Sequence, residues 1–541
     1  MGFCFLWVGN KIYYKCFLLN LMKQKQNQPS FRSLLFVGIF LSSFSVYGES
    51  QEELEREGVW TTTSLIRYSL ENSVQARMSR MDLDNSEYDW EKENGKYNFI
   101  GTLTANTQKT NNLPLPQYTL QGREITSNTL SAGLSKQFST GTSASLTVSD
   151  NRYETDAGKR PEQQGTIAQQ FAQPSLHFAN LGFTLKQELL KNIFGYQQRR
   201  SLEISRRSSA VRRLDAMNNL SRNVVQSLLA FWNLSLADEN QKTAELLVKS
   251  VKNVKEITSS KVRLGVAEDY ESGQWNALLI TAENQLRQTK LEKDRVRRDL
   301  LVSLGKDPET KVGFSLVLDE ALPVLGAEES ETEEAFKHRY DFKSLALQKQ
   351  NAGAALEIAK NGLLPSLYIS GTYNSREYDR NFPNSFDGIG TGRYTQNSAE
   401  IKMDYPLGND TARAEFRNSQ TQSRKMDLLM EQTKEQVKTD VRQGLQKIRT
   451  THEILEESKK NLSQAEKFYA GILPRYRYGR ATSVNVKNAL DLVAQARYGL
   501  MQAKVNYNSA LVQYELSKGT LFRKYGMDSE EVLNQTTGDQ K

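Results

Sequence analysis

The chain has 541 residues, a formal net charge of +8 and a hydrophobic content of 38%. Its apolar runs are shorter than the roughly 20 residues of a membrane-spanning helix, which excludes a helical membrane protein. A basic balance can indicate nucleic acid as a partner, but the secretory signal described next argues against nucleic acid.

Residues 1–48 have the pattern of a secretory signal peptide. Basic residues precede an apolar stretch over 34–46, which ends at Val46-Tyr47-Gly48. We expect cleavage after Gly48, and Met22 is an alternative start because residues 1–21 add nothing that a signal needs. Cys4 and Cys16 both lie before this cleavage site. The mature chain is therefore predicted to hold no disulfide and no cysteine metal site.

Residues 49–310 form the first of two predicted repeats. Apolar spacing predicts a helix over 62–94, and alternation predicts strands over 97–107, 128–138, 142–152 and 175–188. The second and third strands form a hairpin around Ser139-Thr140-Gly141-Thr142. A helix of roughly 65 residues, or about 100 Å, then runs to about Val262. After a turn at Gly265, a return helix ends at Gly305.

Residues 311–525 repeat this order. A helix is predicted over 333–362, strands over 366–376 and 398–407, a long helix over 412–477 and a return helix over 483–518. The turn falls at Gly479. The interval from Gly95 to Gly265 exceeds that from Gly362 to Gly479 by 53 residues, because the first half carries the extra hairpin. The tail, 526–541, is polar and predicted to be disordered.

These elements predict a barrel that several chains share. Short alternating strands in a secreted chain without a membrane helix are typical of an outer-membrane β-barrel. Four strands, or six with the hairpin, cannot close a barrel with a lumen, so several copies must contribute. The long helices would continue from the strands as a tunnel. Six arginines near the start of the first long helix form either a solvated face or a contact with anionic head groups: Arg199, Arg200, Arg206, Arg207, Arg212 and Arg213.

Several segments resemble the TolC family of outer-membrane efflux proteins, over residues 55–525. The passage from Met403 through Tyr405-Pro406-Leu407 to Ala414 is similar to the family's strand-to-helix junction. The passage 185–192 resembles the equivalent junction in the first half, with Glu188 where the family has proline. Leu363-Leu364-Pro365 resembles the entry into a strand, and 478–489 resembles the helix-tip motif.

This resemblance implies a mainly α fold with a transmembrane β portion. The expected assembly is a homotrimer whose 12-stranded barrel in the outer membrane continues as an α-helical barrel in the periplasm. The extra hairpin would give 18 strands if it joined the wall, and we expect it to lie outside a wall of 12. The implied function is the exit duct of a tripartite efflux pump, with a periplasmic adaptor, an inner-membrane transporter and outer-membrane lipid as partners.

A periplasmic gate is expected at the helix tips. The family has aspartates six and nine positions after the second tip glycine, where this chain has Asn485 and Asn488, with Lys487 between them. A neutral ring of amides is therefore predicted. Asp269 and Glu271 of the first tip would form ion pairs with Arg480 or Lys487, within or between neighbouring tips, and such exposed pairs are worth about 0–1 kcal/mol each. Alternatively, all of these are solvated turn residues.

The two tips also resemble the segments that meet an adaptor. These segments are Arg263-Leu264-Gly265-Val266 and Tyr478-Gly479-Arg480-Ala481, and their glycines also suit helix ends. No catalytic arrangement is visible, so no enzyme and no cofactor is predicted. His177, His338 and His452 are scattered, which predicts no metal site and surface positions for all three. Gly388-Ile389-Gly390-Thr391-Gly392 is read as a loop at the outer mouth.

Three other functions remain open at this point. A type I protein-secretion duct would share the same architecture, and neighbouring genes for a pump or for a secreted protein would separate the two. A structural coiled-coil protein of the periplasm would need no detergent, unlike a membrane channel. Metal export is also open, because a duct need not bind its cargo.

Overall fold

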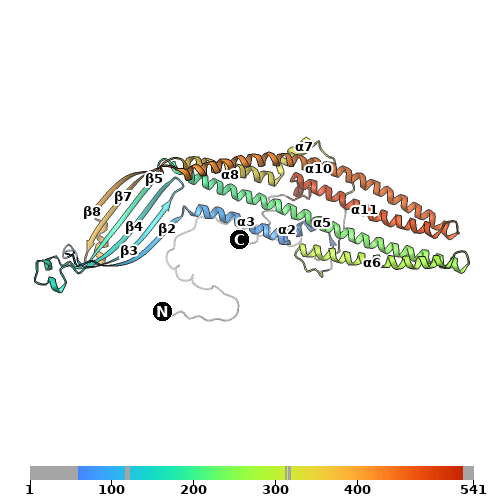
Figure 1. Ribbon diagram of the computed structural model, residues 1–541, viewed down its shortest axis with the longest axis horizontal. Coiled ribbons are helices and arrows are strands. Elements are labelled where there is room, and N and C mark those ends of the chain that lie inside the picture. Colours follow the sequence, from blue (N-terminus) through green and yellow to red (C-terminus); the bar gives the residue numbers. More distant parts are fainter. Residues whose placement is uncertain (1–58, 116–117, 119–121, 311–312, 315–317, 528–541) are drawn as a thin grey trace, which may run out of the picture. The chain divides into compact units, whose positions relative to one another are not determined.

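The structure is a computed structural model that describes residues 59–115, 118, 122–310, 313–314 and 318–527. The expected signal peptide, both cysteines and most of the tail lie outside these residues. Residues from Trp60 onward form one compact unit, which is described below (Figure 1). None of the helices within these ranges combines the length and the hydrophobicity that a membrane span requires.

The first half contains helices, four long strands and a helical hairpin in this order. Its helices and strands are β1 (Val59–Trp60), α2 (Thr62–Asn72), α3 (Val74–Gly95), β2 (Phe99–Asn111), β3 (Glu124–Gln137), β4 (Thr142–Thr155), η1 (Pro161–Gln163), η2 (Ile167–Phe171), β5 (Leu176–Glu188), η3 (Ile193–Gly195), α5 (Tyr196–Arg263) and α6 (Asp269–Ser303).

The second half has the same order with two long strands. Its elements are β6 (Gly313–Phe314), α7 (Glu328–His338), α8 (Tyr340–Gly362), β7 (Ser366–Asp379), α9 (Phe382–Ile389), β8 (Tyr394–Asp404), α10 (Asp410–Arg477), α11 (Ser483–Lys518) and α12 (Leu521–Lys524). The two long helices, α5 and α10, have 68 residues each. They are the long helices that the sequence predicts.

Each half has two shorter helices where one was expected. The predicted helix over 62–94 is broken at Ser73, whose backbone is extended and whose side chain accepts a hydrogen bond from the Ala76 amide at 3.1 Å. This contact caps α3, as serine does at many helix starts. The predicted helix over 333–362 is likewise divided at Arg339, which is extended between α7 and α8. Both breaks interrupt the helices that precede the strands.

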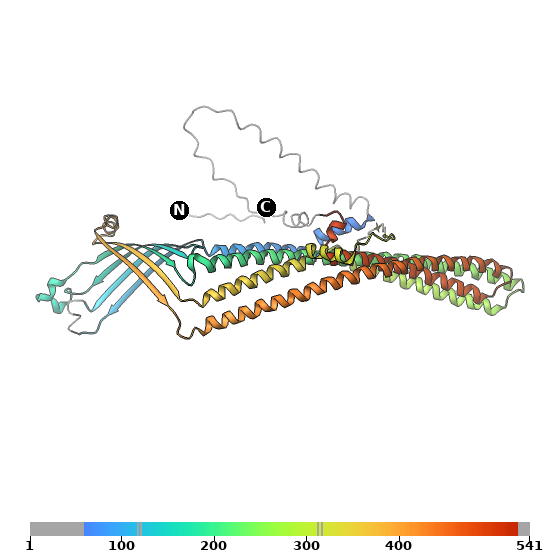
Figure 2. The ribbon, with the colours of Figure 1, turned by 90° about the horizontal axis from the view of Figure 1, so that it is seen from above.

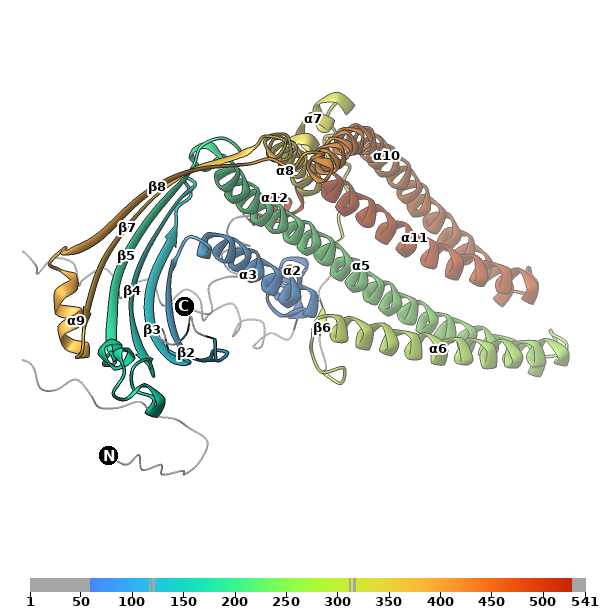
Figure 3. The same cartoon turned by 60° about the vertical axis from the view of Figure 1, so that its left-hand side comes forward.

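All six long strands lie in one antiparallel sheet, in the order β2-β3-β4-β5-β7-β8 (Figures 2 and 3). The expectation that the extra hairpin lies outside the wall is therefore wrong. Its strands, β3 and β4, lie between β2 and β5 and pair with both along their length. The alternation of the hairpin predicted strands correctly, but alternation alone does not tell which strands are neighbours.

The two faces of this sheet differ in composition. On the apolar face, one row across the strands contains Gly101, Leu134, Leu146, Phe183 and Tyr373, which are paired in register. The next residues along the strands point to the opposite, polar face. A row on that face consists of Thr102, Gly133, Thr147, Gly182, Asn374 and Gln396.

The short helix α9 was not predicted from sequence. It follows β7 and packs on the outer end of the apolar face, where the Ser375 hydroxyl donates to the Ile389 carbonyl at 2.6 Å. The ring of His177 lies 5.7 Å from that of Phe382. His177 also bonds Asp150 through Nδ1 at 2.8 Å and is half-buried, as are His338 and His452. The residues 388–392 form the end of α9 and the loop to β8.

The long helices pair with their return helices, α5 with α6 and α10 with α11 (Figure 1). Apolar residues along α10 and α11, among them Val437, Val441, Ile448 and Tyr507, form one buried core. A second core at the other end of these helices joins both halves through Val251, Val254, Trp275, Tyr476, Val486 and Leu490. This second core positions the tips.

Several arginines of the cluster at the start of α5 contact neighbouring helices. Arg200 lies 2.8 Å from Glu203 and 2.9 Å from Glu357 of α8. Arg212 forms an ion pair with Asp89 of α3, and Arg206 lies over the ring of Trp90. These three arginines therefore make contacts from α5 to α3 and α8 while their side chains stay partly exposed.

Candidate gate at the helix tips

The two helix tips have the same backbone geometry because each ends in a glycine with a positive φ. Gly265 has φ 70° and Gly479 has φ 73°. At the first tip the Gly265 amide donates to Val262 at 2.9 Å and the Val266 amide donates to Lys261 at 2.9 Å. The second tip repeats both bonds, from Gly479 and Arg480. This pair of bonds is the Schellman motif, which favours glycine at the left-handed position.

Tyr476 joins the two tips inside one chain. Its side chain is fully buried, and its hydroxyl oxygen lies 2.7 Å from that of Thr258 on α5. The same hydroxyl donates to Glu271 Oε2 on α6 at 3.4 Å. Burial, reinforced by the Glu271 carboxylate, raises the pKa of Tyr476. The phenol is therefore neutral and donates a hydrogen bond at physiological pH.

Two further contacts strengthen this junction. Lys261 Nζ donates to the Tyr476 carbonyl at 3.2 Å and lies 4.1 Å from the centre of its ring. Ser483, at the start of α11, donates to Gln274 Oε1 on α6 at 3.2 Å. Trp275 packs beside them and is fully buried. The first tip is thus fixed to the second by hydrogen bonds that surround an apolar core.

The predicted gate residues lie close to this junction, but the structure pairs them differently. Lys487 bonds Asp491 at 2.7 Å on its own helix, and Asn485 accepts a hydrogen bond from Thr482 at 2.5 Å. Asn485, Asn488, Asp269 and Arg480 are exposed. Within one described protomer, no ion pair joins Asp269 or Glu271 to Arg480 or Lys487. Glu271 contacts Tyr476 instead.

Sequence reasoning missed Tyr476, Thr258 and Lys261. Tyr476 lies three positions before Gly479, where the first repeat has Val262 before Gly265. This difference between the repeats was the available signal, since a tyrosine on an apolar seam needs a partner for its hydroxyl. Its partners lie more than 200 residues away in sequence. Only the folded chain shows that they meet.

The adaptor-docking residues predicted from sequence lie at the free end of the tips. Leu264 is 77% exposed and Tyr478 is 80% exposed. Val266 and Tyr270 of the first tip are exposed as well. Arg263, Gly265, Gly479 and Arg480 are also exposed, whereas Ala481 is half-buried against the core between the tips. Apolar side chains are therefore concentrated at both turns, where they are exposed to solvent in the single chain.

A sheet with one apolar face, continued by two helices of 68 residues that turn back into return helices at glycine tips, is typical of outer-membrane channels with a periplasmic tunnel. Residues 332–519 match the family model for outer membrane efflux protein. The second repeat thus matches outer-membrane efflux proteins, and the chain as a whole has the fold of the TolC-type channels, whose strands lie in the outer membrane and whose long helices lie in the periplasm. Such channels are the exit ducts of tripartite efflux pumps and are not enzymes.

Solved structures of this class have the same fold. The outer-membrane channel OprN is 17% identical, with a TM-score of 0.62 over 85% of this chain and 89% of its own. The CmeC channel of Campylobacter jejuni is 12% identical, with a TM-score of 0.62 over 91% of both chains. The open MtrE channel of Neisseria gonorrhoeae is 14% identical, with a TM-score of 0.62 over 85% of this chain and 88% of its own. No curated protein sequence matches the chain.

Proposed function

We propose that three copies of this chain form the outer-membrane duct through which an efflux pump expels small molecules. The observation that carries this proposal is the six-stranded sheet, whose edge strands β2 and β8 have no further partner among the described residues. Unpaired backbone groups are costly in a membrane, and these edges favour association with further copies. A periplasmic adaptor and an inner-membrane transporter would complete the pump.

The exposed tips are proposed to receive the adaptor. Leu264, Val266, Tyr270 and Tyr478 are between 62% and 80% exposed. Apolar side chains gathered at a helix turn are a common basis for docking another protein. Arg263 and Arg480 beside them would add charge selectivity, which fixes the orientation of a partner more than its affinity.

The gate is proposed to combine a neutral ring with a hydrogen-bonded lock. Asn485 and Asn488 would face the tunnel from three protomers and carry no charge. Tyr476 would hold each pair of tips closed. Asp269 and Arg480 are exposed and form no ion pair within the described residues, so they are available to pair between neighbouring protomers. Opening would then require rupture of a few weak contacts rather than refolding.

Deletion of the gene and its restoration with variants would test this function. We expect the deletion to raise intracellular retention of fluorescent efflux dyes, and we expect Tyr478→Ala to restore export poorly despite normal expression. Leu291→Ala is the matched control, because Leu291 is 71% exposed but lies midway along α6. Unchanged dye export together with loss of a secreted protein would instead identify a protein-secretion duct.

The membrane assignment has a separate test. Purified protein extracted in detergent should form discrete channels in planar lipid bilayers. Failure to form channels, together with solubility in the absence of detergent, would contradict a duct and favour a structural coiled-coil protein of the periplasm.

A further inference from the structure

The strands of the extra hairpin are integral parts of the sheet. Each residue of β3 from Ile125 to Gln137 has a partner on β4, and those from Glu124 to Lys136 have a partner on β2. On its other side, β4 pairs with β5 from Thr142 to Tyr153. A flap outside the wall would leave β2 to pair directly with β5, which does not occur.

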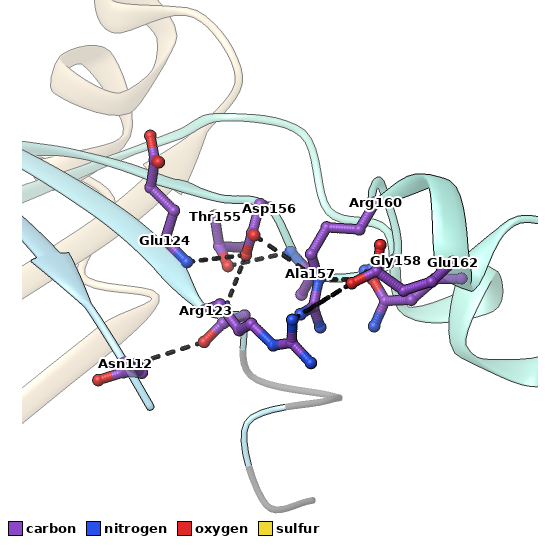
Figure 4. Close-up of polar contacts among 11 residues, drawn as sticks. Asn112, Arg123, Glu124, Thr155, Asp156, Ala157, Gly158, Arg160 and Glu162 are labelled. Atoms are coloured by element: carbon purple, nitrogen blue, oxygen red, sulfur yellow. Dashed lines mark hydrogen bonds and ion pairs between the residues drawn. The ribbon is translucent and has the colours of Figure 1, made fainter. Parts of the chain in front are cut away.

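Both ends of the hairpin are also fixed to its neighbours. At the helix end, the Glu188 amide donates to the Gly141 carbonyl at 3.2 Å, and Gln187 donates to the Thr140 carbonyl at 3.2 Å. At the opposite end, Asp156 Oδ1 accepts hydrogen bonds from the amides of Arg123 at 2.7 Å and Glu124 at 3.0 Å (Figure 4).

Charged side chains extend this outer contact. Arg160 lies 3.6 Å from Asp156 and 3.6 Å from Glu162, and Arg123 lies 3.4 Å from Glu162 (Figure 4). The loop that joins β2 to β3 is thereby tied to the loop that joins β4 to β5. The hairpin is held at both ends as well as along its length.

The hairpin has the same two faces as the rest of the sheet. Leu134 and Leu146 are 46% and 41% exposed on the apolar face, in register with Phe183 at 43%. Such an exposed apolar band matches the lipid-facing side of a membrane barrel. On the polar face, Ser131 pairs with Ser149, as small hydroxyl residues that can line water.

Aromatic contacts on the polar face cross the boundary between the hairpin and the other strands. Tyr153 of β4 lies 6.3 Å from Phe178 of β5, ring centre to ring centre. The row continues to Tyr378 of β7 at 6.2 Å and to Tyr394 of β8 at 5.8 Å. The polar side of β4 is therefore packed as part of the same wall.

The edge strands are suited to pair with each other between copies. β2 leads away from α3 and β8 leads back toward α10, so they run in opposite directions. With 13 and 11 residues, they match the 9–11 residues that a tilted strand needs to cross a bilayer. Antiparallel pairing of β8 with β2 of the next copy would satisfy both edges.

We propose that three copies close an 18-stranded barrel, with six strands from each, in place of the 12 that the resemblance implied. This proposal rests on the proposed trimer for the number of copies. With strands about 4.8 Å apart and tilted by about 40°, the backbone radius would be about 18 Å, against about 12 Å for 12 strands. The outer half would then be as wide as a porin, and the tips alone would limit passage.

Single cysteines would test whether the hairpin lies in the wall. In purified channels reconstituted into lipid vesicles, Ser131→Cys and Thr147→Cys should react with a charged, water-soluble maleimide. Leu134→Cys and Leu146→Cys should react only with a lipid-soluble one. Thr372→Cys and Tyr373→Cys are matched controls on β7. Equal reaction of all four hairpin cysteines with the charged reagent would overturn the proposal.

Disulfide cross-linking would test the closure of the barrel. Thr104→Cys on β2 would be combined in turn with Gln396→Cys, Ser398→Cys and Glu400→Cys on β8, and we expect at least one pair to give covalent dimers and trimers. Thr104→Cys with Asn180→Cys on β5 should give no cross-link. The opposite pattern would show that β2 adjoins β5 and that the barrel has 12 strands.

Conductance of each variant separates this proposal from the proposed function. Channels that conduct but show the 12-strand pattern would refute the 18-stranded wall and leave the duct intact. If the cysteine-free parent, like its variants, formed neither channels nor trimers, the trimeric duct itself would be refuted.

Discussion

The backbone of Gly141, in the turn between β3 and β4, lies directly against the backbone of Gly195, at the start of α5. A Cβ added at Gly141 would lie 2.9 Å from the Gly195 nitrogen, and a Cβ added at Gly195 would overlap the carbonyl of Ser139. Both glycines have a positive φ of 73°. The inner end of the extra hairpin therefore rests on the junction where strand becomes helix.

Substitution of Gly195 by alanine should weaken this junction. The side chain would have to displace the turn at Ser139, so we expect Gly195→Ala to cost about 1–3 kcal/mol beyond the backbone strain alone. Gly165→Ala is the control, because Gly165 has φ +79° but open space around it. Thermal stability of the detergent-extracted trimer would measure the difference. Equal losses in both variants would show that the contact carries no stability.

Removal of the Tyr476 hydroxyl should favour the open gate. Tyr476→Phe loses the bonds to Thr258 and Glu271 but keeps the buried ring, at a cost of about 1 kcal/mol to the closed tips. The ratio of open to closed states should therefore rise about fivefold for each of the three latches. Single-channel recording would measure it. Tyr498→Phe on α11 is the control, because the buried Tyr498 hydroxyl has no hydrogen-bond partner among the described residues, and it should leave the ratio unchanged.

A Thr258→Val change made alone and with Tyr476→Phe would complete a double-mutant cycle. If the two hydroxyls act through their shared bond, the double variant should open little more than either single one. Strictly additive effects would contradict a lock between these residues.

Charge at the proposed ring should set ion selectivity. Asn485→Asp with Asn488→Asp would add six carboxylates in a trimer and raise the permeability of K⁺ over Cl⁻ on the order of tenfold. The parent channel should be weakly selective. Reversal potentials in a KCl gradient would measure both. Strong cation selectivity of the parent that persists in Glu271→Gln would rule out the neutral ring.

Arg339 should give the helical region a pH-dependent stability. It lies between α7 and α8 and bonds Asp341 and Asp440, each at 2.7 Å. Burial of Asp341 opposes its ionisation, but the hydrogen bonds and charge of Arg339 outweigh burial and lower its pKa. The carboxylate therefore stabilises the fold above its unfolded pKa of about 4. This stability is lost as the pH falls through the lower folded value.

Thermal unfolding followed by circular dichroism between about pH 3 and pH 6 would measure this effect. Arg339→Gln should lower stability by about 2 kcal/mol near pH 6 and flatten the decline toward pH 3. Lys438→Gln is the control, because its pair with Glu435 is exposed, with side chains 48% and 67% accessible. If the stability of Arg339→Gln fell as steeply toward pH 3 as that of the parent, the pair of Arg339 and Asp341 would not be the source of the pH dependence.

The strands and long helices could be predicted because their patterns are local. Alternation over the long strands and the apolar seam of α10 repeat over many residues, and glycines mark both tips. The breaks at Ser73 and Arg339 were missed because a capping serine or an extended arginine looks like any helical residue in sequence. The place of β3 and β4 was missed because neighbouring strands depend on pairing across the sheet.

The candidate site was less accessible to sequence reasoning than the fold. Asp269, Glu271 and Lys487 were predicted as gate residues from their charge and from their positions relative to Gly265 and Gly479, and they do lie on or near the tips. Their partners depend on side-chain directions that sequence does not specify: Lys487 turns along its own helix to Asp491, and Glu271 turns inward to Tyr476. Thr258 and Tyr476 are 218 positions apart in the sequence, which hid the 2.7 Å contact between their hydroxyl groups.

The bond between Tyr476 and Thr258 lies within one chain, and this has a consequence for how the channel would respond to a partner. In the proposed trimer, each protomer would carry its own Tyr476 latch, because both hydroxyl groups belong to one chain. A trimer would then have three independent latches, and an adaptor that released one of them would leave the other two shut. Permeation would increase in steps as successive adaptors engaged, rather than in a single switch.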